Sequence, residues 1–249
     1  MGRFAVIAAG YPIDTTPVAA PSWVAVASPT DRFDNLRTSR LVLRRWQDGD
    51  REPFAALNAD PIAMRFFPAT LDRAASDALI DRIEERFEAQ GFGLWALEIA
   101  RTGQFIGFTG LNPLPEDVPG AGGMEVGWRL ARPAWHNGYA TEAARAALDV
   151  AFGPLRMDEI YSMTAVLNEP SQAVMRRLGL TELCRWDHPR IAEASPLRAH
   201  VTYRLIPDKG LPDDRSEDNV DLADGLVQLP AAAPAAREHG GVARAQLPW

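Results

Sequence analysis

The chain has 249 residues, a formal net charge of −7 and one cysteine, Cys184. A single cysteine excludes an internal disulfide and a cysteine-rich metal site. The four histidines lack the H-x-x-x-H and H-x-x-E spacings, so no metal is expected. Because no stretch approaches about 18 consecutive apolar residues, we expect a cytoplasmic protein that does not bind membranes.

Both ends of the chain differ in composition from its middle. Segments 1–35 and 208–249 show no sustained apolar period, and the second is acidic and rich in proline and alanine, with a net charge of −4. The middle is therefore nearly neutral, and nucleic-acid binding is not expected. We predict two mostly disordered tails around one domain at 36–207, which is long enough for a single buried core.

In chain order, the apolar patterns first predict one strand, two helices and a hairpin, at residues 41–46, 50–58, 74–90, 94–100 and 104–112. A loop rich in proline and glycine follows at 113–123. Met124–Leu130 then alternates with period two, which is typical of a strand.

The most informative feature is the junction W-H-N-G-Y-A-T-E-A at 135–143, where a turn opens into an alanine-rich helix that ends at Gly153. Gly138 and Ala140 let the backbone approach a ligand closely. The first-turn amides of a helix lack intrahelical partners and carry about half a positive charge. The junction thus predicts a phosphate-binding loop, although an ordinary strand-to-helix connection would look similar.

Two further pairs of elements complete the predicted domain. Residues 158–166 form a candidate strand, and a short helix follows with Asn168 as N-cap, Pro170 in its first turn and Gly179 as its stop. Strands at 181–186 and 200–206 are expected to close the sheet as an antiparallel pair.

Three motifs in this order resemble the GNAT superfamily of acetyl-CoA-dependent N-acetyltransferases. The resemblance is closest to its RimJ/RimL-like branch, which includes ribosomal-protein N-terminal acetyltransferases. The motifs are E-x-G-W at 125–128, W-x-x-G-Y-A-T-E-A at 135–143, and N-x-x-S followed by L-G-L at 168–180. The start of the domain, L-R-T-S-R-L-V-L-R-R-W, looks like the first strand of the family. The resemblance implies an α/β GNAT fold with a central mixed, mostly antiparallel sheet flanked by helices.

The resemblance also implies a reaction, the direct attack of a primary amine on acetyl-CoA. Glu125 would be the general base, alone or through a water, and Ser171 would hydrogen-bond the coenzyme sulfur. The alternatives are a strand carboxylate that is solvated or paired with Arg129, and an ordinary first-turn serine. The tyrosine that protonates the thiolate in many relatives is replaced here by Met175.

The residues implied to bind the coenzyme come from the same motifs. The pyrophosphate is expected on the amides of 136–141, and the pantetheine beside the main chain of the motif strand. The full set is Trp128, Leu130, His136, Asn137, Gly138, Tyr139, Ala140, Thr141, Asn168 and Ser171. Relatives usually have a glycine and a basic or amide residue where this chain has His136 and Asn137, so one phosphate-binding cation is expected to be missing.

The acceptor is left open by the sequence. We favour a peptide or protein N-terminal α-amine over a small amine such as a polyamine, aminosugar or aminoglycoside. The expected groove lies between 65–70, 113–123 and 186–196, where Glu116 and Asp117 would suit a cationic amine or be ordinary loop charges. A non-catalytic acyl-CoA-binding regulatory module is the other hypothesis. We expect a monomer or a homodimer.

Overall fold

The computed structural model describes residues 6–7, 11–12 and 32–207, so most of both predicted tails lies outside the described residues. Strands β1 (Val6–Ile7) and β2 (Tyr11–Pro12) form a short antiparallel pair. Within the described ranges, no helix has the length and apolar character needed to cross a membrane.

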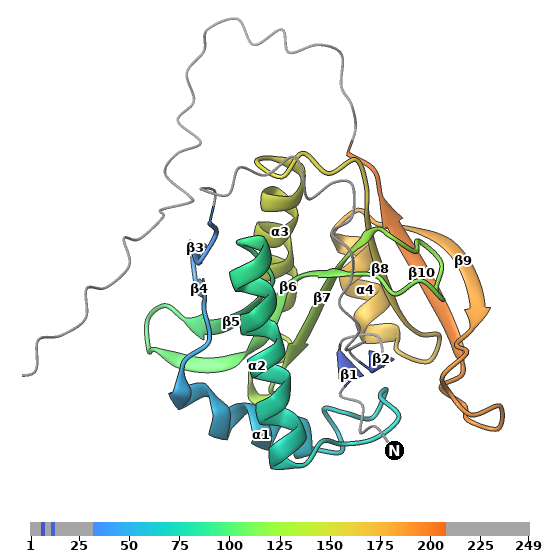
Figure 1. The fold of residues 1–249 in the computed structure, drawn as a ribbon, viewed down its shortest axis with the longest axis horizontal. Coiled ribbons are helices and arrows are strands. Elements are labelled where there is room, and N and C mark those ends of the chain that lie inside the picture. Colours follow the sequence, from blue (N-terminus) through green and yellow to red (C-terminus); the bar gives the residue numbers. More distant parts are fainter. Residues whose placement is uncertain (1–5, 8–10, 13–31, 208–249) are drawn as a thin grey trace, which may run out of the picture.

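An eight-stranded sheet forms the centre of the domain (Figure 1). Its order is β3-β4-β5-β6-β7-β8-β10-β9, and every neighbouring pair is antiparallel except β7 and β8. This confirms the predicted central, mixed and mostly antiparallel sheet. The strands are β3 (Asn35–Arg37), β4 (Leu41–Arg44), β5 (Leu94–Ile99), β6 (Gln104–Pro113), β7 (Met124–Leu130), β8 (Ile160–Ala165), β9 (Thr181–Asp187) and β10 (Ala199–Leu205).

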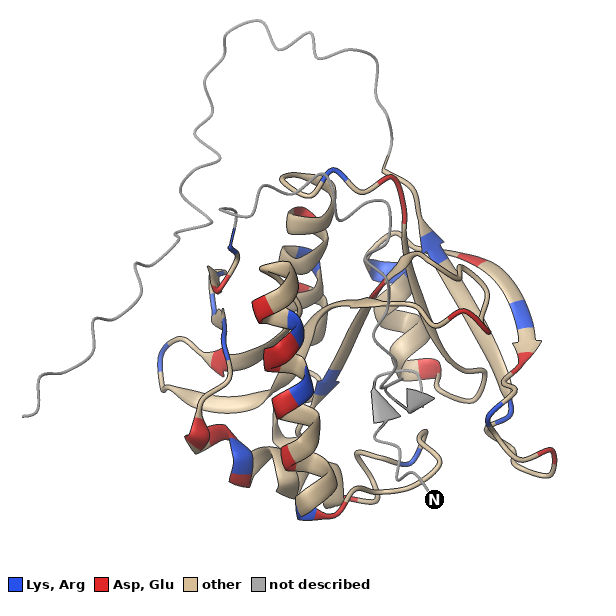
Figure 2. Ribbon diagram, in the orientation of Figure 1, with Lys and Arg blue, Asp and Glu red and all other residues tan. Residues whose placement is uncertain are grey.

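Helices flank this sheet. In the described part of the chain they are α1 (Arg51–Ala59), α2 (Arg73–Gln90), α3 (Tyr139–Phe152) and α4 (Glu169–Arg177), with short 3-10 helices η2 (Asp48–Asp50) and η3 (Arg132–Ala134). The α2 helix begins where the Asp72 side chain accepts a hydrogen bond from the Ala75 amide at 2.8 Å, and it ends at the left-handed Gly91. Acidic and basic side chains alternate along it (Figure 2).

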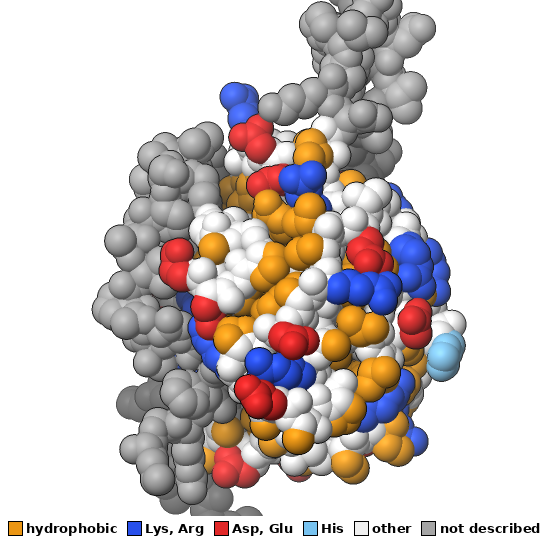
Figure 3. Space-filling view, turned by 90° about the vertical axis from the view of Figure 1, so that its right-hand side faces the viewer, with side chains coloured by type: hydrophobic (Ala, Val, Ile, Leu, Met, Phe, Trp, Pro, Cys, Tyr) orange, Lys and Arg blue, Asp and Glu red, His pale blue; other side chains and the backbone are white. Residues whose placement is uncertain are grey.

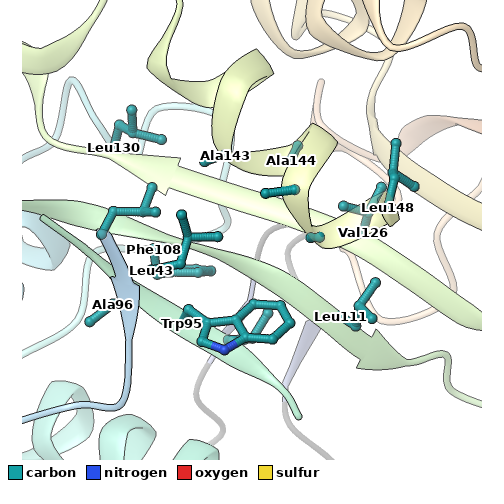
Figure 4. Close-up of a cluster of buried hydrophobic side chains, with 14 of the residues drawn as sticks. Leu43, Trp95, Ala96, Phe108, Leu111, Val126, Leu130, Ala143, Ala144 and Leu148 are labelled. Carbon is teal, nitrogen blue, oxygen red and sulfur yellow. The ribbon is translucent and has the colours of Figure 1, made fainter. Parts of the chain in front are cut away.

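Small side chains let α3 approach the sheet closely. Ala143, Ala144 and Leu148 are buried, and Figure 4 shows them over the strands beside Val126. In the same core, Trp46, which follows β4, contacts Phe54 of α1 with 4.7 Å between ring centroids, so aromatic packing ties the end of β4 to α1. The face that carries β9 and β10 intersperses acidic, basic and hydrophobic side chains (Figure 3), unlike the single-sign stripe of nucleic-acid-binding proteins.

A buried ion pair joins the start of the domain to the rest. The Arg44 guanidinium binds the Asp50 carboxylate through two bonds of 2.7 and 2.9 Å and also contacts Glu98 at 2.9 Å. These contacts hold η2 against β4 and β5. Removal of one partner would leave a buried charge uncompensated, which is strongly destabilising.

The segment that resembles one first strand is in fact two strands, and this expectation is wrong. The Thr38 amide donates to the Leu41 carbonyl at 2.9 Å, and the Leu41 amide donates to the Thr38 hydroxyl at 3.1 Å. These bonds close a turn, so β3 folds back antiparallel on β4. The expected motif strand at 124–130 and the Asn168 cap of α4 are confirmed.

Residues before β3 also contact the sheet. The Phe33 amide donates to the Gly91 carbonyl at 2.8 Å, and the buried Trp95 indole donates to the Phe33 carbonyl at 2.6 Å. The two bonds tie the segment before β3 to the end of α2 and to β5.

We therefore predict that a protein of residues 36–207 is less stable than one of residues 32–207. Loss of the Phe33 carbonyl leaves a buried indole donor without its partner, which costs about 1–3 kcal/mol. Urea unfolding of the two proteins and of the full chain measures this. The longer form should match the full chain, since the tails are predicted to be dispensable, and equal midpoints for both truncated forms would contradict the assigned role of Phe33.

Candidate active site

The two parallel strands of the sheet separate almost at once. Register pairing between β7 and β8 is confined to Glu125 and Tyr161, and the rest of β7 pairs with β6 alone. A cavity of about 1330 Å³ lies along the diverging part of β7, between the α1–α2 loop, the start of α3 and α4. The parallel strands thus leave room for a ligand beside main-chain groups of β7.

The turn before α3 is shaped by two residues with left-handed backbone angles. His136 has φ 62° and Gly138 has φ 77°, and Gly138 is the N-cap of the helix. The helical bond pattern begins with the Glu142 amide, which donates to the Gly138 carbonyl at 3.1 Å. The amides of Tyr139, Ala140 and Thr141 therefore belong to the first turn, whose donors favour an anion.

A carboxylate from this helix binds the turn between β3 and β4. Glu142 accepts hydrogen bonds from the Thr38 hydroxyl at 2.6 Å, the Ser39 hydroxyl at 3.1 Å and the Arg40 amide at 3.0 Å. Its other oxygen binds the Arg40 guanidinium at 2.6 Å. Burial acts to raise the pKa of Glu142, but the bonds from Thr38 and Arg40 outweigh it and hold that pKa below its usual value.

Arg40 also contacts the turn itself. Its Nη1 donates to the Asn137 carbonyl at 2.9 Å, and its guanidinium lies 4.9 Å from the centre of the Tyr139 ring. Arg40 lines the cavity. Sequence analysis missed this residue because it is 97 positions away from Asn137. A cation therefore lies at the turn where the family resemblance suggested that one was missing.

Most residues expected to bind the coenzyme line this single cavity. They are Trp128, Leu130, His136, Gly138, Tyr139, Ala140, Thr141, Asn168 and Ser171. Asn137 is not among the lining residues, and its side-chain amide donates to the Trp135 carbonyl at 2.9 Å. Three separate segments thus meet at one site, while the roles given to their residues stay predictions.

On α4, Asn168 and Ser171 face the cavity, and Met175 belongs to the core. The Asn168 side chain accepts from the Ser171 amide at 3.3 Å and donates to the Thr164 hydroxyl at 2.8 Å. These bonds fix the start of α4 on β8. Ser171, in the first turn, is therefore a polar residue of the cavity lining together with Asn168.

Glu125 is buried away from the cavity lining. It is 2% exposed and accepts a hydrogen bond from the Asn112 side chain at 3.2 Å, while Arg86 of α2 binds the same Asn112. Burial raises the pKa of Glu125 to about 7, against the opposing effects of Asn112 and Arg86. This burial contradicts the first alternative from the sequence, a solvated carboxylate, and Arg129 donates to the Asn58 side chain.

Two segments expected to frame the acceptor groove do not line this cavity. Asp117 binds Arg190 at 2.7 Å, which joins 113–123 to 186–196. Leu114 and Val118 form a small apolar cluster with Tyr161, so this loop packs on β8. Of the expected frame, only the α1–α2 loop contributes lining residues.

The cavity lining is basic. Its charged residues are Arg37, Arg40, Arg65, Arg129, Arg145 and Arg177, against Glu142 and Asp149. Glu142 is already bound to Arg40. Within the described ranges, no group of three or more His, Cys, Asp and Glu side chains could hold a metal ion. The site is therefore built for an anionic ligand.

Comparison with known proteins finds a match to the acetyltransferase (GNAT) domain family over residues 40–181, more than half of the chain. The chain is 30% identical to YkkB, an uncharacterized protein of Bacillus subtilis, over 158 residues that span 62% of this chain and 91% of YkkB.

Solved structures agree with this match. An acetyltransferase from Agrobacterium tumefaciens is 28% identical, with a TM-score of 0.55 over 69% of this chain and 93% of that one. The ribosomal-protein-S5-alanine acetyltransferase from Vibrio fischeri is 14% identical, with a TM-score of 0.55 over 72% of this chain and 99% of that one. At that identity, the second likeness is one of fold alone.

We predict that Gly138→Val weakens acetyl-CoA binding at least 10-fold. A β-branched residue at φ 77° is strained, and its Cβ would lie 3.4 Å from Arg40 Nη2 beside the helix start. Gly122→Val is the matched control, because Gly122 has φ 76° in open space outside the cavity lining. Calorimetry on the folded variants measures affinity, and equal losses would show a general effect of strain.

We predict that Arg40→Met also weakens acetyl-CoA binding, by roughly 10-fold, because a charge-assisted bond contributes about 1.5–3 kcal/mol. The control is Arg101→Met, an exposed arginine in the β5–β6 turn outside the cavity lining. The loss should shrink as salt rises, since salt screens exposed charges. An unchanged dissociation constant for Arg40→Met would remove this residue from the phosphate site.

Proposed function

The chain belongs to the GNAT acetyltransferase family, and on this premise we propose that it transfers the acetyl group of acetyl-CoA to a primary amine by direct attack. The observation that carries the proposal is the convergence of three motif segments on one basic cavity. The first-turn amides of α3 and Arg40 bind the pyrophosphate, and the pantetheine follows β7 toward Ser171.

The acceptor amine must lose a proton to attack the thioester, and we assign this proton to Glu125. A general base is most effective when its pKa lies near the working pH, and the raised pKa of about 7 meets that condition. Glu125 and Arg129 are four residues apart on β7, roughly 13 Å at the rise of an extended strand. Since Arg129 lines the cavity and Glu125 does not, the proton reaches Glu125 through water.

The leaving thiolate needs a hydrogen-bond donor, and Ser171 supplies it in this proposal. Ser171 lines the cavity from the first turn of α4. Met175, at the position of the usual tyrosine, is 1% exposed and has no proton to give. We therefore assign Ser171 a hydrogen bond to the sulfur as negative charge develops there.

For the acceptor, the charges of the lining favour an α-amine over a polycation. Six arginines against two acids would repel a polyamine or an aminoglycoside. We propose a peptide or protein N-terminal α-amine, in keeping with the RimJ/RimL-like motifs, with a small amine as the alternative. A cytoplasmic location and a monomeric or homodimeric state stay predictions from the sequence.

The test is the release of free thiol from acetyl-CoA with a panel of primary amines. Thiol release that depends on the amine supports transfer. Binding of acetyl-CoA with no release for any amine, at any pH between 6 and 9, would favour the non-catalytic acyl-CoA-binding module instead.

We predict that Glu125→Gln lowers kcat roughly 100-fold and leaves acetyl-CoA affinity unchanged, because the amide keeps the shape and cannot accept the proton. In the native protein kcat should rise through pH 7, since a base must be ionised, and this limb should be lost in the variant. Glu52→Gln, an exposed change on α1, is the control. The same pH profile in both variants would exclude Glu125 as the base.

A further inference from the structure

The cavity extends between α3 and α4, which contact each other. Residues that recur every three or four positions share one face of a helix, and the lining residues have this spacing on both helices. They are Glu142, Arg145, Ala146 and Asp149 on α3, and Pro170, Ser171, Val174 and Arg177 on α4. One face of each helix therefore borders the cavity, beyond the helix starts that are assigned to the pyrophosphate and the sulfur.

The part of the cavity between the two helices combines an apolar surface with two positive charges. Ala146 and Val174 are buried and belong to the hydrophobic core. Arg145 and Arg177 are exposed, and both line the cavity. A mostly apolar wall with a few placed polar groups is typical of a site for a small molecule.

Arg145 reaches across from α3 to the end of α4. Its Nη2 donates to the Arg177 carbonyl at 3.4 Å. This bond is long and occupies one of the five N–H donors of a guanidinium, so the others remain for a ligand. The bond places the Arg145 guanidinium beside the last turn of α4, from which Arg177 also borders the cavity.

The Arg177 guanidinium forms no hydrogen bond or ion pair with any residue that the structure describes. Its neighbour Arg176 differs, because it lies outside the cavity lining and binds the Glu169 carboxylate at 3.5 Å and the Tyr203 hydroxyl at 3.2 Å. The planar donor fork of an arginine binds a phosphate through two parallel bonds. Arg177 is therefore suited to an anionic ligand in the cavity.

The acids of the lining do not cancel these two arginines. Glu142 is bound to Arg40. Asp149 lies one helical turn beyond Arg145, whose charge opposes the rise in the pKa of Asp149 that burial causes. Two arginines therefore outweigh one acid between the helices, and the net charge there is positive.

These arginines lie farther along the helices than the residues assigned to the pyrophosphate. Arg145 follows Tyr139 by six residues, roughly 9 Å at the rise of an α-helix. Coenzyme A carries a second anionic group, the 3′-phosphate of its adenosine, and one ribose separates this group from the pyrophosphate. A helical side chain leans toward the N-terminus of its helix, which shortens the distance that the ribose has to span.

We infer that Arg145 and Arg177 bind the 3′-phosphate of coenzyme A, and that Ala146 and Val174 contact its adenosine. The inference rests on the coenzyme site of the proposed function and deepens it. The consequence is selectivity for the acyl donor. A thioester whose pantetheine is not joined to adenosine 3′-phosphate lacks these contacts and binds more weakly.

The test compares coenzyme A with 3′-dephospho-coenzyme A, which lacks only this phosphate. Calorimetry on the full chain measures both dissociation constants without any turnover. We expect 3′-dephospho-coenzyme A to bind roughly 10- to 100-fold more weakly, as for hydrogen bonds between charged groups. The ratio of the two dissociation constants is the quantity to follow in each variant.

Arg145→Gln and Arg177→Gln should each lower this ratio, and the double variant should remove most of it. The affinity for 3′-dephospho-coenzyme A should stay unchanged in all three, which also shows that the variants are folded. Arg176→Gln is the matched control, since it removes the same charge one position away and outside the cavity lining, and it should keep the ratio. Arg40→Met should weaken both ligands by the same factor, because they share the pyrophosphate.

Equal affinity of the native protein for the two ligands would overturn the inference, as would a ratio that survives the double variant. A ratio that falls equally in Arg176→Gln would also overturn it, because the effect would then come from the overall charge of α4. Binding of coenzyme A without thiol release for any amine would contradict the proposed transfer and leave the 3′-phosphate site standing. Failure of both ligands to bind would contradict the coenzyme site itself, and this inference would fall with it.

Discussion

The separation of β7 from β8 is the constraint on which the rest of the site depends. A parallel pair needs a crossover connection, and here the crossover is α3. Because the two strands pair only at Glu125 and Tyr161, the main chain of β7 beyond that point faces the cavity. The crossover places the start of α3 at one side of this opening, and α4, which follows β8, forms another side. The lack of pairing between β7 and β8 beyond these residues therefore leaves the cavity open, and the starts of α3 and α4 border it.

Glu142 gives the start of α3 its position. An acid in the first turn of a helix is favourable through the dipole alone, by typically 0.3–1 kcal/mol. Here the same carboxylate also accepts bonds from Thr38, Ser39 and Arg40, so it joins the β3–β4 turn to the helix. It holds Arg40 beside the turn that precedes the helix. The carboxylate thereby positions a positive charge at a site that is itself favourable for anions.

The sequence predicted the parts of this site that are local in the chain. Alternation identified β7 with its observed bounds, and the Asn168 cap and the stop at Gly153 follow from the backbone preferences of single residues. The Arg40–Glu142 pair was not predictable in this way, because it joins residues 102 positions apart. The break between β3 and β4 was missed for a similar reason. The Thr38 side chain turns the chain there, and both flanking segments read as strand.

Long-range pairing also explains why two of the three segments expected to frame the acceptor groove do not line the cavity. Asp117 looked available for a cationic amine, but it binds Arg190 from a segment 73 residues away. The charged residues that do line the cavity are mostly arginines, among them Arg129, which alternation in β7 could place on a face of the sheet but not beside a cavity. Composition gives the net charge of a domain, and only the fold tells which charges are paired with one another.

Glu125 and Arg129 share one face of β7, and burial moves the pKa of each toward its neutral form, up to about 7 for the acid and down to about 9 for the base. This is the behaviour of a region from which water is largely excluded, where a fixed charge acts strongly on a bound ligand. The two side chains start roughly 13 Å apart along the strand, so a group beside Arg129 is too far from Glu125 for direct proton transfer. The proton transfer proposed for Glu125 therefore requires an intervening water.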